Sequence, residues 1–127
     1  MKKCLNILVI LISIITVISG LTQAIAPGFV LGFIGAEITP TSAHFFAIIG
    51  MFMVLFGGLM LHAVYSPLPQ EPAILWSALQ KLGAAGAVTL GIYNGIFSII
   101  ASAVAAFDLF SGLLFLYYLW TIKKRYA

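Results

Sequence analysis

Long apolar runs, separated by short polar or turn-rich segments, dominate the pattern of this chain. Four of the runs fall at about 4–25, 41–65, 73–94 and 98–121. Each has the roughly 20 residues that an α-helix needs to cross a bilayer. A backbone in lipid has to satisfy its own hydrogen bonds, so we expect helices in all four runs. The pattern therefore predicts an all-α, polytopic membrane protein in which residues 1–127 form a single bundle of four transmembrane helices.

The segment between the first two runs, residues 27–40, is mostly apolar but is broken by glycine and proline. It is too short to span, so we expect a short helix that lies in the outer membrane interface. Four of its side chains are expected to dip into lipid or to pack on the bundle: Phe29, Leu31, Phe33 and Ile34. Thr39 followed by Pro40 predicts the start of the second span, with threonine as the cap and proline at the first helical position.

The composition agrees with a membrane location. Hydrophobic residues make up 63% of the chain and charged residues 7%, whereas a soluble domain carries about 25% charged residues. A chain this apolar could not cover its own surface with polar groups in water. We therefore expect the lipid bilayer as the surrounding medium. No basic patch is interleaved with aromatic residues, so we expect no nucleic-acid partner.

The basic residues indicate the orientation of the bundle. Five of the six flank the outermost runs: Lys2, Lys3, Lys123, Lys124 and Arg125. Positively charged flanks stay preferentially in the cytoplasm, and an even number of spans places both termini on one side. We therefore expect a multi-pass protein of the cell (inner) membrane with cytoplasmic N and C termini. Lys81 is the basic residue that this rule does not explain.

The first run resembles a secretory signal as well as a transmembrane helix. Its basic start and apolar core are followed by Ala24-Ile25-Ala26, whose small residues resemble a cleavage site. Pro27 would directly follow the cut, where proline blocks the peptidase, and the run is long enough to span. We favour a retained helix. Cleavage would leave three spans and a cytoplasmic C-terminus, so the charges do not decide the question.

Small residues recur along the third and fourth runs. Those of the third run are four apart and share one stripe of a helix: Gly83, Ala87, Gly91 and Gly95. Those of the fourth run form a similar face that includes an acid: Ala101, Ala105, Asp108 and Gly112. Helices in lipid associate through close approach of their backbones at small residues. We interpret both stripes as packing faces, the first for the bundle itself or for a membrane protein partner or second copy.

Asp108 is the carboxylate inside a predicted span, and an unpaired charge there costs about 3 kcal/mol. If the third helix ends at the Asn94-Gly95 turn, Lys81 lies about one turn from the depth of Asp108, and we predict an ion pair between them. If that helix runs on to Ser98, Asn94 is the better partner. Gln80 and Asn94 flank the same stripe. The ion pair is either a structural contact that fixes the register of the two helices, which we favour, or part of a proton or ion relay.

The remaining reactive side chains do not form a recognisable catalytic group. His44 and His62 flank the second span, about 27 Å apart along a helix, so they cannot share one metal ion. The single cysteine, Cys4, excludes an intramolecular disulfide and a cysteine metal cluster. The sequence has no nucleophilic triad, phosphate-binding loop or paired carboxylate. We therefore expect no catalytic residue, no metal and no cofactor, and a protein that is not an enzyme.

Three short motifs resemble a known family. They are APGFVLG at 26–32, HFFAIIG at 44–50 and LFG at 55–57, and their order is similar to that of small bacterial four-helix membrane proteins of the DoxX-like type. The resemblance implies a proline-led apolar loop after the first helix. Some such proteins are subunits of quinone-linked oxidoreductases, which implies a quinone- or lipid-facing site with Phe29, Phe33 and His44 as candidates. Relatives often carry arginine where this chain has His44.

These observations lead to one function and two alternatives. The leading hypothesis is a non-enzymatic accessory or scaffolding subunit of a membrane complex, which associates through the small-residue stripe. The first alternative is a small oligomeric carrier or channel that uses Asp108 and Lys81 as its polar path. The second is a quinone- or lipid-binding module with a pocket between the outer loop and the second helix.

Overall fold

The fold is entirely helical over the part of the chain that the structure describes. The computed structural model describes residues 2–126, and the side chains of residues 3–125. Its elements are α1 (Lys2–Ile25), α2 (Pro27–Phe33), α3 (Pro40–Tyr65), α4 (Glu71–Tyr93), the 3-10 turn η1 (Ile99–Ala101) and α5 (Ser102–Tyr126). Four of the helices, α1, α3, α4 and α5, are long and apolar enough to cross a membrane. The predicted all-α bundle with four spans is confirmed, and the chain is a multi-pass membrane protein.

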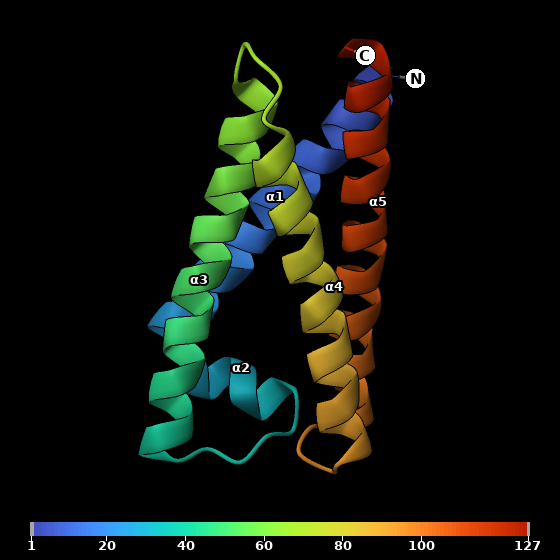
Figure 1. Ribbon diagram of the computed structural model, residues 1–127. Helices are drawn as coiled ribbons and strands as arrows, with labels where there is room; N and C mark the ends of the chain where they lie inside the picture. Colours follow the sequence, from blue (N-terminus) through green and yellow to red (C-terminus); the bar gives the residue numbers. More distant parts are fainter. Residues whose placement is uncertain (1, 127) are drawn as a thin grey trace.

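The four long helices form two pairs (Figure 1). The start of α1, the α3–α4 connection and the end of α5 lie at one end of the bundle, here called the terminal end; α2 and the α4–α5 connection lie at the opposite, α2 end. Helix α1 crosses behind α3 and α4 from the terminal end to the α2 end. It packs chiefly on α3, whereas α4 packs chiefly on α5, and the two pairs meet over a smaller area.

Glycines allow α1 and α3 to pack with their backbones in contact. A Cβ atom at Gly20 would lie 2.7 Å from the carbonyl oxygen of Gly50, and one at Gly50 would lie 2.6 Å from that of Gly20. Two turns further along α3, a Cβ at Gly57 would lie 2.6 Å from Val17 Cγ2. Real Cβ atoms do not approach so closely, so each position needs glycine. This glycine contact between the first two spans was not predicted from the sequence.

The small face predicted on the fourth run packs on α4. Ala101, Ala105, Asp108 and Gly112 are all buried. A Cβ at Gly112 would lie 3.1 Å from the carbonyl oxygen of Ala78 and closer still to the side chain of Leu82. In lipid, close approach of this kind supplies the van der Waals contact that holds helices together.

Local signals fix the turns at the α2 end. Thr39 and Ser42 form a reciprocal capping box at the start of α3, with Pro40 in the first turn, as predicted in part from Thr39-Pro40. Helix α4 ends at Tyr93, and Gly95 (φ +74°) closes it: the amides of Gly95 and Ile96 donate to the carbonyls of Ile92 and Gly91. The alternative in which this helix continues to Ser98 is therefore wrong.

Helix α2 lies across the bundle at the end opposite the two chain termini (Figure 1). Two of the four apolar side chains expected to contact lipid or the bundle, Leu31 and Ile34, are buried in the fold, whereas Phe29 and Phe33 are exposed. The Ser98 amide donates to the Ile34 carbonyl at 2.8 Å, which ties the α4–α5 connection to the loop after α2.

Candidate functional site

The most polar point within the spans is centred on Lys81 of α4. Lys81 is buried, with 5% of the residue's surface exposed, and Asp108 of α5 is 9% exposed. The Lys81 ammonium forms an ion pair with Asp108 Oδ1 at 3.4 Å, so the predicted contact is present. It also donates to Thr16 Oγ1 of α1 at 2.6 Å and lies 5.2 Å from the centroid of the Phe107 ring. We call Thr16, Lys81 and Asp108 the polar node.

The end of α4 decides which side chain meets Asp108. Because the helix stops at Tyr93, α5 returns with Asp108 near the depth of Lys81. Asn94 becomes the exposed C-cap of α4, far along the helix from the node, and is not its partner. Gln80, the other amide of the predicted polar set, lines a narrow crevice beside Lys81.

Thr16 was not identified from the sequence. A threonine in a membrane helix can bond to its own backbone, and Thr16 Oγ1 does donate to the Ile12 carbonyl at 2.8 Å. Its lone pairs remain able to accept from Lys81. The available signal was the run of hydroxyl residues Ser13, Thr16, Ser19 and Thr22 along a mostly aliphatic helix. Its meaning depended on which helix α1 would cross.

Further hydroxyl groups surround the polar node, but the space beside it is too narrow for water. Ser13 and Ser111 donate to carbonyls of their own helices, at 2.8 and 2.7 Å. The hydroxyl of Ser77 is buried and has no hydrogen-bond partner among the described residues. Ser13 and Ser77 line a crevice beside Lys81 that is too narrow to admit a water molecule. In this conformation the polar node can therefore fix the positions of the helices, but it offers no water-filled path for an ion or a proton.

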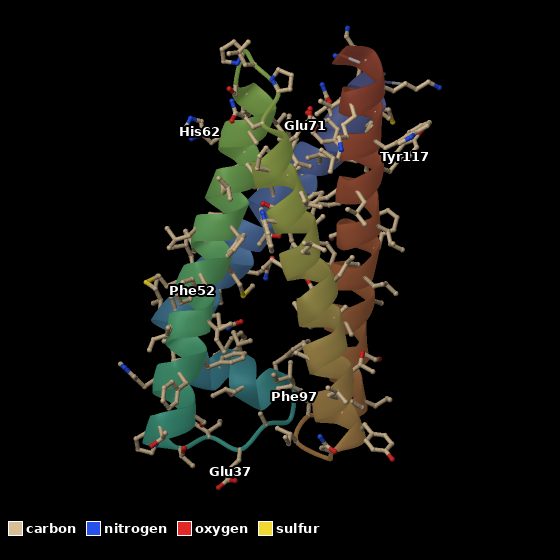
Figure 2. The ribbon with its side chains drawn as sticks, in the orientation of Figure 1. Glu37, Phe52, His62, Glu71, Phe97 and Tyr117 are labelled. Atoms are coloured by element: carbon tan, nitrogen blue, oxygen red, sulfur yellow. The ribbon has the colours of Figure 1, made fainter. Side chains whose placement is uncertain are left out.

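The glycines predicted to form one stripe on α4 do not share an internal packing face. Gly83 and Ala87 are exposed on the outer side of the helix, and a Cβ at Gly83 would meet no atom within 4 Å. Gly91 instead lies under the ring of Phe97, at the α2 end (Figure 2). Gly95 forms the turn. The four positions therefore do not form one packing face inside the bundle, because α5 packs on a different side of α4 and the helix ends before Gly95. Contact of the exposed positions with a partner protein stays a prediction.

The outer side of α4 has its own regular pattern. Residues at alternating intervals of three and four are exposed along the whole helix: Trp76, Leu79, Gly83, Gly86, Leu90 and Tyr93. Two glycines lie at its centre, and a Cβ at either would meet no atom within 4 Å. Intervals of three and four characterise the seam of a coiled coil. We call these six residues the outer α4 face.

The residues proposed for a quinone or lipid site point outward. His44 is exposed at the start of α3, with its ring 6.4 Å from that of Phe45. Phe29 and Phe33 are also exposed, and none of the three lines the crevice beside the node. His62 projects from the other end of α3 (Figure 2). Over residues 2–126 no three His, Cys, Asp or Glu side chains gather into a group that could hold a metal ion.

Comparison of the chain with protein-family models, with curated proteins and with solved structures found no match in any of the three.

Proposed function

We propose that this four-span membrane protein is an accessory or scaffolding subunit, which assembles laterally with another membrane protein through the outer α4 face. The observation that carries the proposal is the exposed glycine pair at the centre of that face, Gly83 and Gly86, with open space where side chains would be. Lipid tails solvate leucine as well as a protein does, so an exposed helix gains nothing from glycine at its midpoint unless another backbone approaches there.

The pattern around the two glycines fits a partner helix. Leu79 and Leu90 are the next residues of the outer α4 face on either side of the glycine pair, and both are exposed. Trp76 and Tyr93 end the seam near the two ends of the span, where amphipathic rings favour the interfaces. A second helix crossing at about 20° could place its backbone over the glycines and its side chains between the leucines.

The polar node supports the same proposal. Lys81 points to the side of α4 opposite the outer face and bonds to helices of both pairs. These bonds fix the rotation of α4, so the same residues always face outward. The resemblance to DoxX-like proteins, some of which are subunits of oxidoreductases, is a further support for a subunit role.

Leucine substitutions test the proposal. We expect wild-type protein to co-purify with a partner or a second copy in mild detergent. Replacing Gly83 and Gly86 by leucine fills the seam and should abolish that association while the monomer still folds. Gly58→Leu is the matched control, because Gly58 is also exposed in a span and a Cβ there would meet no atom within 4 Å. Recovery of wild-type protein from native membranes only as a monomer would contradict the proposal.

A small carrier or channel is the second candidate, and the observation that favours it is the buried ion pair beside the unpartnered Ser77 hydroxyl. Buried ionisable groups in spans often mark ion or proton pathways. This function requires a conformation that admits water to the crevice. Flux in proteoliposomes that is lost in Asp108→Asn would support it, and absence of flux under varied ion gradients would remove it.

A further inference from the structure

A second cavity, of about 180 Å³, opens at the terminal end of the bundle. Three elements that meet there form its wall: the start of α1, the α3–α4 connection and the end of α5 (Figure 1). Its polar lining residues are Asn6, Ser66, Gln70, Tyr118, Thr121 and Arg125. At about 30 Å³ per water molecule, the space holds about six waters, or a phosphate group with a few attached atoms.

Arg125 is the charged residue on the wall of this cavity. The neighbouring basic residues are engaged elsewhere: Lys123 lies 3.9 Å from Glu71, and Lys124 lies over the Trp120 ring at 5.0 Å. Among the residues whose side chains are described, no carboxylate lies within ion-pair distance of Arg125. Its guanidinium therefore presents an unneutralised fork of donors, which suits a phosphate or carboxylate group.

The amide and hydroxyl groups of the wall complement that charge. Ser66 accepts a hydrogen bond from Gln70 Nε2 at 3.1 Å, so its own proton is free to be donated into the cavity. Asn6, near the start of α1, adds an amide to the lining. Among the residues whose side chains are described, the lining thus combines one cation with neutral donors and has no acid. The remaining walls are apolar, with Leu5 and Ile122 among them.

The position of the cavity along α5 indicates where its ligand comes from. Tyr117 and Trp120 are exposed on the turns of α5 that line the cavity, and their rings stack at 5.9 Å; Tyr117 projects from the outer side of α5 (Figure 2). Exposed tyrosine and tryptophan at the end of a span mark the depth of lipid headgroups. The cavity therefore lies where headgroup phosphates are concentrated.

We propose that this cavity binds a negatively charged phosphate group, presented by the headgroup of an anionic phospholipid, with Arg125 as its counter-ion and the Asn6 and Ser66 side chains as further donors. A free phosphate ion offers the same chemistry from solution. The site is independent of the outer α4 face, since it lies at the end of the bundle and uses other residues.

Native mass spectrometry of the purified full-length protein tests this site, with phosphatidylglycerol, phosphatidylcholine and inorganic phosphate added in separate arms. We expect a bound phosphatidylglycerol that Arg125→Gln weakens about tenfold more than Lys124→Gln does, because a charge-assisted bond is lost in addition to a unit charge. Lys124→Gln removes the same charge outside the cavity. Asn6→Leu leaves the net charge unchanged and should also weaken binding.

The arms separate the sources of phosphate. Binding of phosphatidylglycerol that depends on Arg125, with little binding of phosphatidylcholine, supports a lipid headgroup. Binding of inorganic phosphate alone, with the same dependence on Arg125, supports a phosphate site filled from solution. Equal effects of Arg125→Gln and Lys124→Gln in every arm, or equal binding of the two lipids, would overturn the proposal.

Discussion

The Lys81 ammonium lies closer to the Thr16 hydroxyl oxygen, at 2.6 Å, than to the Asp108 carboxylate, at 3.4 Å. Charge-assisted bonds between ammonium and carboxylate groups are commonly about 2.8 Å long. The lysine is thus held by a neutral acceptor on α1 as well as by its counter-ion on α5. The two bonds link the α1–α3 pair to the α4–α5 pair.

Thr16→Val should therefore destabilise the bundle, although the change is nearly isosteric. It removes an acceptor from a buried lysine, and we expect a loss of about 1–3 kcal/mol in the free energy of unfolding. Unfolding of purified protein in detergent measures this loss. Thr22→Val is the control, because Thr22 is exposed and donates only to the Ile18 carbonyl of its own helix. Equal stability of the two variants would show that the Thr16 bond contributes nothing.

Lys81 and Asp108 should be coupled in a double-mutant cycle. Lys81→Met or Asp108→Leu alone leaves one charge buried without its partner, and we expect each to cost about 3 kcal/mol or more. The double variant replaces the pair by apolar groups and should recover much of that loss. The same unfolding measurement gives all four stabilities. Two outcomes would argue against a structural role for the ion pair. One is that the losses in unfolding free energy of the two single variants add up in the double variant, and the other is that Asp108→Asn leaves stability and assembly unchanged.

The contact between α1 and α3 should be sensitive to a single methyl group. Gly50→Ala places a Cβ 2.6 Å from the Gly20 carbonyl oxygen, so the helices must separate. We expect a loss of about 1–3 kcal/mol from this overpacking. Gly58→Ala, on the open side of the same helix, should be neutral or slightly stabilising because alanine favours the helix. Detergent unfolding of both variants tests the difference, and a tolerated Gly50→Ala would refute the close packing.

The sequence predicted those parts of the fold that depend on local pattern. Run length gave the four spans, Thr39-Pro40 gave the start of α3, and Asn94-Gly95 gave the turn that brings Asp108 to the depth of Lys81. Which faces meet is a different kind of information. Small residues are suited equally to a neighbour in the same chain and to a partner, so Gly83 and Gly50 look alike in sequence although one is exposed and the other is buried.

Cys4 reports the orientation of the bundle, which we propose has both termini in the cytoplasm. The cysteine is exposed at the terminal end. A membrane-impermeant thiol reagent should label it in inverted vesicles and leave it unlabelled in intact cells. The same experiment tests retention of α1, because cleavage after Ala26 would remove Cys4 and abolish labelling in both preparations. Labelling in intact cells would contradict the proposed orientation.

Photo-crosslinking in native membranes tests lateral assembly through the outer α4 face most directly. A photoreactive amino acid replaces Leu90, which is exposed on that face toward the α2 end of the bundle, or Leu109, which is exposed on α5. The proposed assembly predicts a protein adduct of one defined mass from position 90 and none from position 109. Adducts only to lipid at position 90, or the same protein adducts from both positions, would contradict it.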